Sequence, residues 1–435
     1  MIEYIPLILF ALVFILILFG YPVALVLGGI SVVSGLLFFD IDFFYLVSLR
    51  IFGIMNNFVL LAVPLFIFMG MTLERSGIAE KLLETMAILF GKIKGGLAYS
   101  VIIVGGMLAA STGIVGATVV TMGLISLPVM IKRGYNTKLA TGVIASSGTL
   151  GQIIPPSIVL IILGDVFQVP VGDLFRAAVG PGLTLVAAYI LFILVVAYWN
   201  KDLAPAIPAD PSRGNKKKQV IRALADIVPS LTLVLLVLGS IFMGVATPTE
   251  SAAVGCIGAI GLAVLYRTFE VGMVKDAALE SVKITSMVFG ILIGATAFSM
   301  VFSYTGGEEI VEHLLLNLPG DEKWGFIIFT MLAILVLGFF IDFVEISYII
   351  VPILLPVSEA LGINPVWFAI LIAMNLQTSF LTPPFGFSLF YLKGVAPAGV
   401  KTMQIYRGVI PFIIIQVVVL GVVAFYPEFF GMSTT

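Results

Sequence analysis

The sequence predicts an all-α polytopic membrane protein with inverted-topology repeats, two re-entrant helical hairpins and two broken helices. Three observations support this fold class. Of the 435 residues, 60% are hydrophobic and only 11% are charged, whereas about a quarter of the residues in a soluble domain are charged. A polar, proline-containing segment occurs twice in otherwise apolar sequence, at 146–157 and 375–386. Matching segments of the two halves also carry opposite charges, which indicates that the second half lies upside down.

The composition excludes several classes of function. A net charge of −2 is not that of a nucleic-acid-binding surface. One cysteine, Cys256, and one histidine, His313, offer no basis for an internal disulfide, a Cys/His metal site or a haem. No phosphate-binding GxxxxGK[ST] loop is present, so ATP hydrolysis is not expected. The first apolar run, 5–39, is too long for the core of a signal peptide and is expected to be retained.

Apolar length predicts the membrane spans, because a crossing helix needs about 20 apolar residues. The candidate spans are 4–19, 22–39, 56–73, 138–163, 174–199, 226–245, 248–268, 284–303, 364–392 and 408–427. Two further stretches, 95–131 and 323–358, are predicted to be hairpins. The first has lysines at both ends and a small, polar tip at 110–116, which favours entry and exit on one side. Such a tip is tolerated at membrane depth only where protein or water surrounds it.

Loop charge predicts the orientation of the chain. The segment 200–225 is rich in Lys and Arg and is expected to be a cytoplasmic linker, whereas 306–322 is acidic, has no Lys or Arg and is expected outside. Both termini then lie outside. Full double crossings by the hairpins would give the same sidedness, so charge alone does not establish re-entrance.

The two halves align at a constant offset in residue number, 383 − 155 = 228, which places Pro155 on Pro383. Without a gap, this offset pairs Pro128 with Pro356, Gly134 with Gly362, Asn136 with Asn364 and Ala145 with Ala373. An odd number of crossings separates equivalent positions, so the repeat is inverted, as in many secondary transporters. The predicted organisation is a scaffold with its first arm helix (1–94), half of a transport domain (95–199), the linker (200–225), further scaffold with a second arm (226–322), and the other half of the transport domain with the last span (323–435).

The repeated segment has the chemistry of a site for a cation and an anion. Consecutive prolines lack N–H groups and leave nearby carbonyl oxygens unpaired. Carbonyls and Ser/Thr hydroxyls suit Na⁺, whereas the N–H groups at helix N-termini suit a carboxylate. This arrangement needs few buried formal charges, each of which costs at least ~2.5 kcal/mol near the bilayer centre.

At these residues the chain resembles the large, DctM-type membrane subunit of tripartite ATP-independent periplasmic (TRAP) transporters. The matching motifs are Ser147–Ser157, Leu381–Gly386, Ala246–Ala253, and Gly338–Glu345 together with Pro356. The resemblance implies an elevator-type importer of organic acids in a bacterial or archaeal inner membrane. It also implies coupling to two or more Na⁺, no organic cofactor, no catalytic residue and no nucleic-acid partner. The implied partners are a small DctQ-type membrane subunit, a DctP-type periplasmic substrate-binding protein, a carboxylate substrate and membrane lipid.

The resemblance also implies which residues form the sites. The first Na⁺ site corresponds to Ala109, Thr112, Gly151, Ile154 and Pro155, and the second to Gly338, Ser379, Thr382 and Phe385. The substrate is expected near Ser111, Ser147, Thr149, Asn375 and Gln377. Ser379 stands where the family more usually has glycine, so the backbone angle that the family has at this position is not assured here. Ala109 stands where the family often has serine, so a side-chain ligand is lost.

Simpler interpretations remain open for several of these residues. Membrane Ser and Thr hydroxyls often bond the carbonyl one turn back. Asp342 and Glu345 are candidates for function or for capping the second tip, and Glu250 is expected to cap a helix with Thr247 or Thr249. The rival functions are a Na⁺/anion symporter of related fold that needs no binding protein, an intramembrane enzyme, for which paired catalytic groups are missing, and a passive channel.

Overall fold

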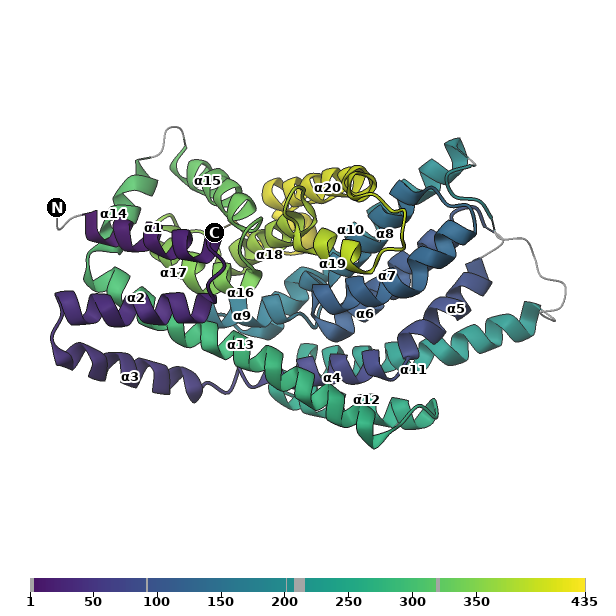
Figure 1. The fold of residues 1–435 in the computed structure, drawn as a ribbon, viewed down its shortest axis with the longest axis horizontal. Coiled ribbons are helices and arrows are strands. Elements are labelled where there is room, and N and C mark those ends of the chain that lie inside the picture. The colour runs from purple at the N-terminus through teal and green to yellow at the C-terminus, as the bar shows by residue number, and fades with distance from the viewer. Residues whose placement is uncertain (1–3, 91–92, 201, 207–215, 318–320, 435) are drawn as a thin grey trace.

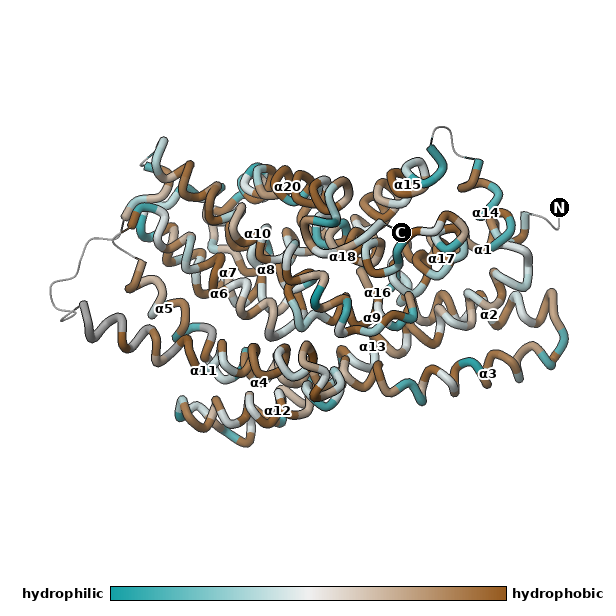
Figure 2. The backbone as a smooth tube through the Cα atoms, turned by 180° about the vertical axis from the view of Figure 1, so that it is seen from behind, coloured by the Kyte–Doolittle hydropathy of each residue, from teal (hydrophilic) through white to brown (hydrophobic). Residues whose placement is uncertain are grey.

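The computed structural model describes all residues except 1–3, 91–92, 201, 207–215, 318–320 and 435. The described part is helical and contains no β-strand, which confirms the predicted all-α class (Figure 1). Six described helices are long and apolar enough to cross a membrane. They are Val115–Lys132, Val171–Trp199, Pro248–Leu265, Val271–Tyr304, Phe343–Ala360 and Thr402–Phe425. Many large apolar side chains are exposed, and hydrophobic residues occur along most of the helices (Figure 2).

The first half runs through α10. Its elements are α1 (Ile5–Leu18), α2 (Val23–Phe38), α3 (Ile41–Met55), α4 (Ala62–Arg75), α5 (Ile78–Phe90), α6 (Gly96–Thr112), α7 (Val115–Lys132), α8 (Thr137–Thr149), the 3₁₀ turn η2 (Leu150–Gln152), α9 (Ile158–Val166) and α10 (Val171–Trp199). The second half consists of α11 (Lys216–Phe242), α12 (Pro248–Leu265), α13 (Val271–Tyr304), α14 (Gly307–Leu316), α15 (Glu322–Leu337), α16 (Phe343–Glu345), the π-helical η4 (Ile346–Ile350), α17 (Val351–Ala360), α18 (Pro365–Leu381), α19 (Phe387–Val395), α20 (Thr402–Phe425) and the 3₁₀ turn η5 (Pro427–Phe430).

The helix boundaries repeat at the offset found in the sequence. The residue numbers at the starts of α7 and α16 differ by 343 − 115 = 228, and those at the starts of α8 and α18 by 365 − 137 = 228. Asn136 and Asn364 cap these last two helices in the same way, since each side-chain oxygen accepts two backbone N–H groups of the first turn. The repeat is therefore one of local structure as well as of residue type.

The first half departs from the second between α3 and α4. Helix α3 was not among the predicted spans, because Asp40, Asp42 and Arg50 make the stretch too polar for an apolar-length criterion. Residues 56–61 form turns, so the predicted span 56–73 becomes a helix only at Ala62. The equivalent stretch of the second half is the single continuous helix α13.

The helices pack into two groups (Figure 1). Helices α2, α3 and α4 contact α13, and α4 and α11 contact α12. In the other group α8 contacts α6, α7 and α20, while α18 contacts α15 and α20. We call the first group the scaffold group, because its helices come from the predicted scaffold segments; that it is a scaffold for a separate transport domain stays a prediction.

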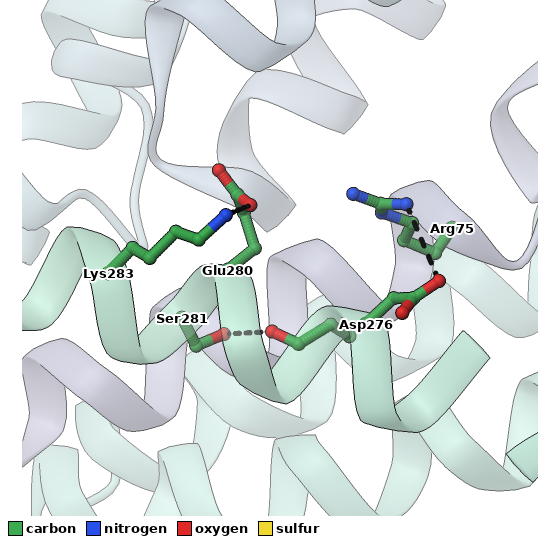
Figure 3. A network of polar contacts seen from close by, with 6 residues as sticks. Arg75, Asp276, Glu280, Ser281 and Lys283 are labelled. Carbon is green, nitrogen blue, oxygen red and sulfur yellow. Dashed lines mark hydrogen bonds and ion pairs between the residues drawn. The ribbon is translucent and has the colours of Figure 1, made fainter. Parts of the chain in front are cut away.

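An ion pair joins α4 and α13 within the scaffold group. Arg75 at the end of α4 faces Asp276 near the start of α13, with Nη1 and Oδ2 4.0 Å apart (Figure 3). Lys283 and Glu280 form a second ion pair within α13, at 3.3 Å. The neighbouring Glu74 reaches the other group instead: its carboxylate accepts a hydrogen bond from the Thr121 hydroxyl on α7, at 2.6 Å.

The ends of each hairpin lie beside a different part of the chain. Gly95 and Asn136, at the two ends of the α6–α7 pair, donate backbone hydrogen bonds to Ala204 and Leu203 after α10. At the α15–α17 pair, Lys323 and Asn364 bond residues 433 and 434 near the C-terminus. The two ends of each pair thus lie beside one and the same segment of the chain. That each is re-entrant remains a prediction.

Candidate functional site

The first broken helix leaves carbonyl oxygens without donors. Helix α8 ends at Thr149, and Pro155 and Pro156 separate η2 from α9. The backbone N–H groups of Ile153 and Ile154 both donate hydrogen bonds to the carbonyl of Leu150, and the Ser157 hydroxyl donates to the carbonyl of Gln152. Within the described part of the chain, no donor reaches the carbonyls of Gly151, Ile154 or Pro155. Gly151 and Pro155 are buried, so these oxygens fit the ligand set expected for a small hard cation.

The tip of the first hairpin is closed by a left-handed glycine. Helix α6 ends at Thr112, and Gly113 has φ +62° and donates its N–H to the carbonyl of Ala109, at 2.9 Å. The Thr112 hydroxyl lies 2.9 Å from that of Thr118. Thr118 in turn bonds the carbonyl of Ile114, at 3.1 Å. The backbone N–H of Ile114 also donates to the Thr112 hydroxyl, at 3.5 Å, so Thr112 is held at the tip by the residues just after it.

The tip and the break of the first half touch through their backbones. A Cβ placed on Gly151 would lie only 2.6 Å from the carbonyl oxygen of Ala109. Gly113 packs similarly against Ile158, the first residue of α9. The structure therefore brings together Ala109 of the hairpin and Gly151 of the break, two of the residues predicted to share the first ion site.

The second broken helix has the same plan but is more open. Helix α18 ends at Leu381, and the carbonyl of Thr382 accepts the N–H of Gly386, at 3.0 Å. The Tyr406 hydroxyl bonds the carbonyl of Pro384, at 2.8 Å. Among the described residues, nothing donates to the carbonyl of Phe385, whose side chain is 44% exposed. The second break is thus accessible from the surface, whereas the first is buried.

The second tip meets the second break at Gly338 and Ser379. A Cβ on Gly338 would lie 2.7 Å from the Cβ of Ser379. Nearby, the rings of Phe340 and Phe385 pack with centroids 5.2 Å apart. The residues predicted for the second ion site are therefore also adjacent.

The close approach in the two halves uses glycine on opposite partners. Gly151 lies on the break in the first half, and its equivalent, at 151 + 228 = 379, is Ser379. Ser379 lies in regular helix within α18, and its hydroxyl bonds the carbonyl of Leu376, at 2.8 Å. The contact remains possible because the hairpin supplies Gly338. The questioned backbone angle at Ser379 is therefore ordinary.

The predicted substrate residues form two symmetric pairs that point in different directions. Ser147 and Asn375 (375 − 147 = 228) face their own hairpins: Ser147 packs on Gly105 of α6, and Asn375 donates to the carbonyl of Met331 on α15, at 2.6 Å. Thr149 and Gln377 (377 − 149 = 228) face the middle of the domain. The side chain of Ser111 lies outside the described part of the structure.

Thr149 and Gln377 meet a buried polar cluster at the centre. The Gln416 amide of α20 donates to the Tyr189 hydroxyl of α10, at 2.8 Å, and lies 3.4 Å from the Thr149 hydroxyl. The Gln377 side chain of α18 lies near the same hydroxyl, although its amide meets hydrogen-bond geometry with no described residue. All four side chains are essentially inaccessible. Gln416 was missed from sequence, although a single amide inside the apolar run 412–423 signals a buried polar site.

Most hydroxyls at the breaks also bond carbonyls within their own helices. Thr382 donates to the carbonyl of Thr378 at 2.7 Å, Thr149 to that of Ser146 at 2.9 Å, and Ser147 to that of Ile144 at 3.0 Å. This is the simpler interpretation of these side chains. Because each hydroxyl hydrogen is used locally, its oxygen lone pairs remain available to a cation or to another donor.

The three acidic residues singled out in the sequence lie in different settings. Asp342 caps α16 by accepting the N–H of Phe343, at 2.6 Å. Glu345 is 7% exposed, and one of its oxygens has no hydrogen-bond partner among the described residues. Glu250 forms the expected capping box with Thr247 at the start of α12. No three His, Cys, Asp or Glu side chains of the described chain come together as a metal cluster.

An apolar cleft of about 450 Å³ separates the scaffold group from the first broken helix. Its walls come from α4, α5 and α11 on one side and from α6 and α10 on the other, with Ile154 and Pro155 among the lining residues. Polar contacts cross the boundary elsewhere. Besides Glu74 and Thr121, the Asn57 amide donates to the Asp165 carboxylate at the end of α9, at 2.5 Å. Few contacts of this kind would have to break for the groups to slide.

Comparison with known proteins assigns this architecture to a family. Residues 10–429 match the family described as "Tripartite ATP-independent periplasmic transporter, DctM component". The chain is 31% identical, over 92% of its length and 91% of the relative's, to the C4-dicarboxylate TRAP transporter large permease protein DctM of Pseudomonas aeruginosa. It is 29% identical, over 95% of its length and 96% of the relative's, to the sialic acid TRAP transporter large permease protein SiaM of Vibrio cholerae.

A solved structure shares the fold at low identity. The Alcanivorax borkumensis YdaH transporter superposes with a TM-score of 0.64 and 15% identity, covering 94% of this chain and 97% of that one. That transporter is described as having an unusual topology. The likeness places the arrangement of helices among transporter folds.

Proposed function

Because the chain belongs to the DctM family of tripartite ATP-independent periplasmic transporters, we propose that it is the large permease of a Na⁺-coupled importer of an organic acid. The transported acid would arrive from a periplasmic binding protein and cross an inner membrane by an elevator movement. As a TRAP large permease the chain is a multi-pass membrane transporter and not an enzyme.

The observation that carries the proposal is the pairing of each hairpin tip with its own broken helix. In the first half, Ala109 of the tip lies against Gly151 of the break; in the second, Gly338 lies against Ser379. The proposed ligands are the oxygens near these contacts, with Thr112 and Thr382 among them. These neutral oxygens suit Na⁺ and do not require a buried carboxylate. Sodium, when bound, supplies the positive charge that makes a nearby organic anion tolerable inside the membrane.

Backbone donors are the proposed partners of the carboxylate. The starts of α9 and α19 have no side-chain cap, so their first N–H groups are free for an anion. Both starts directly follow the breaks. The Pseudomonas relative is named for C4-dicarboxylates and the Vibrio relative for sialic acid, which supports a carboxylic acid without selecting one.

The packing supports an elevator mechanism. The group formed by α6–α10 and α15–α20 would move as one body, while α1–α4 and α11–α13 stay fixed and the arms α5 and α14 brace the movement. The apolar cleft beside Ile154 and Pro155 offers a smooth surface for sliding. We further propose that a small membrane subunit joins the scaffold, that lipid surrounds both, and that the chain's two termini are periplasmic.

Uptake into proteoliposomes tests the proposed coupling. The full chain with its small subunit and binding protein is supplied with candidate carboxylates under an inward Na⁺ gradient, and then with choline in place of Na⁺. Uptake should vanish in choline. Uptake driven by a proton gradient alone would contradict Na⁺ coupling, and undiminished uptake without any binding protein would favour the rival symporter.

Replacing Thr112 or Thr382 by Val should raise the Na⁺ concentration for half-maximal uptake by about tenfold, because each loses an oxygen that contacts a charge. Thr296→Val is the matched control. Its hydroxyl bonds only the carbonyl of Leu292 on α13, within the scaffold group. An unchanged Na⁺ titration of the Thr112 or Thr382 variant would remove that residue from the site.

A further inference from the structure

The central polar cluster lies between the two ion sites. Thr149 precedes Gly151 by two residues, and Gln377 precedes Ser379 by two residues. Thr149 and Gln377 are also equivalent in the repeat. The cluster therefore contacts both broken helices at equivalent positions, two residues before a residue of each predicted ion site.

Buried polar side chains lie between the two helices at this point. From α8, the Thr149 hydroxyl lies 3.4 Å from the Gln416 amide, which donates to the Tyr189 hydroxyl at 2.8 Å. From α18, the buried Gln377 amide lies near that same hydroxyl without hydrogen-bond geometry to it, and α18 packs directly against both α10 and α20. The tyrosine ring packs edge-on against Phe412, with centroids 5.2 Å apart, so the hydroxyl has a fixed position.

Burial of these polar groups lowers the stability of the protein, which points to a role other than packing. Gln377 and Gln416 are 0% and 1% exposed. Three of their polar atoms have no hydrogen-bond partner among the described residues: the amide nitrogen and oxygen of Gln377 and the amide oxygen of Gln416. Each unsatisfied buried group costs about 1–3 kcal/mol. Apolar side chains of similar size would avoid that cost.

The helices that carry the cluster pack directly against the two broken helices, so a movement of one broken helix reaches the cluster. Helix α20 lies directly on α8, because Gly142 and Gly408 bring the two backbones into contact two turns from the cluster. Helix α10 contacts α18. A displacement of α8 is therefore passed to Gln416, from Gln416 to Tyr189, and from Tyr189 to Gln377 on α18.

We propose that Gln416 and Tyr189 are positioning residues that couple the two broken helices, so that cation occupancy at one break raises the cation affinity of the other. The inference rests on the two-ion site of the proposed function and adds the route of communication between its halves. Gln416 and Tyr189 contact neither ion; they act through Thr149 and Gln377.

Hydrogen–deuterium exchange during a Na⁺ titration tests the coupling without measuring transport. The purified full chain in lipid nanodiscs is titrated with NaCl, and choline chloride keeps the ionic strength constant. Peptides containing the tips 109–116 and 337–343 report each half separately. In the wild type both tips should gain protection with the same midpoint and a Hill slope well above one.

Gln416→Met keeps the length of the side chain and removes both polar atoms, and Tyr189→Phe keeps the packed ring and removes only the hydroxyl. In either variant the slope should fall to about one, and the midpoint of at least one tip should rise about fivefold or more. Thr184→Val removes a hydroxyl of α10 that bonds only the carbonyl of Gly180, and it should titrate like the wild type.

The outcomes separate the two proposals. Wild-type slope and midpoints in both Gln416→Met and Tyr189→Phe would overturn the coupling while leaving Na⁺ binding intact. Wild-type tips that titrate independently would do the same. Absence of any Na⁺-dependent protection at either wild-type tip would overturn the proposed ion sites themselves, and the coupling with them.

Discussion

At the scale of single residues, the sites depend on backbone atoms that a few small side chains leave accessible. Gly151 in one half and Gly338 in the other allow a hairpin tip to touch a break. The prolines then leave carbonyls unpaired near that contact. The proline pairs could be found from the repeat, because proline has a strong local effect on the backbone, whereas Gly151 and Gly338 were selected by the resemblance to the TRAP family.

The glycine contact at the second site yields a reciprocal prediction. Gly338→Ala should lower stability by about 1–3 kcal/mol, because its Cβ overlaps the Ser379 side chain. Adding Ser379→Gly makes room and should restore Na⁺-dependent thermal stabilisation to the Gly338→Ala protein. The comparison uses melting temperatures in NaCl and in choline chloride.

Gly261→Ala is the control for that series, since no atom lies within 4 Å of the added methyl group. It should leave both melting temperatures nearly unchanged, or raise them slightly. Failure of Ser379→Gly to improve the Gly338→Ala protein would show that the two residues do not share a contact.

Residue identity alone could not predict where side chains point. Ser147 and Asn375 read as polar groups near a break, yet Asn375 is bonded to α15 and Ser147 packs on α6. Gln416 lies on a later helix than Gln377, and only the packing of α20 brings it to the centre. Such contacts depend on tertiary structure, for which a single sequence has no local signal.

At the scale of helices, boundaries were predictable where capping or helix-breaking residues mark them. Asn136, Asn364 and the two proline pairs bound α8, α9, α18 and α19 close to the predicted spans 138–163 and 364–392. Helix α3 was missed because it is amphipathic: of its residues only Phe43 is buried. Apolar length identifies crossing helices but not helices of mixed polarity.

The crossing of α8 and α20 yields a prediction about helix packing. A Cβ on Gly408 would lie 2.9 Å from the Thr141 hydroxyl and against the backbone of Lys138, so Gly408→Ala should separate the helices. The free energy of unfolding should fall by about 1–3 kcal/mol, measured as loss of thermal stability in detergent.

Gly421→Ala lies in the same helix and meets no atom within 4 Å. It should be neutral or slightly stabilising. Equal effects of the two substitutions would mean that backbone contact between α8 and α20 is not what holds the last span against the first broken helix.

At the scale of the whole molecule, the repeat could be predicted from the sequence. The repeat does not show which group of helices moves and which stays fixed. The constant offset between the halves follows from the sequence and is repeated in the helix boundaries. Which group of helices moves requires knowledge of contacts between groups. Helix α4 packs against α6, and polar contacts cross the boundary at Glu74–Thr121, Asn57–Asp165 and Arg176–Phe242, with an apolar cleft nearby.

Cross-linking across that boundary tests the central claim, a transport domain that slides against a fixed scaffold. In a Cys256→Ala background, a cysteine pair at Glu74 and Thr121 links α4 to α7, across the boundary. A pair at Arg75 and Asp276 links α4 to α13, within the scaffold (Figure 3). A short bifunctional thiol reagent is applied before Na⁺-driven uptake is measured.

Cross-linking the boundary pair should abolish uptake, and a reducible reagent should allow recovery on reduction, while the scaffold pair should retain uptake near that of the untreated protein. Undiminished uptake by the fully cross-linked boundary pair would contradict the elevator account.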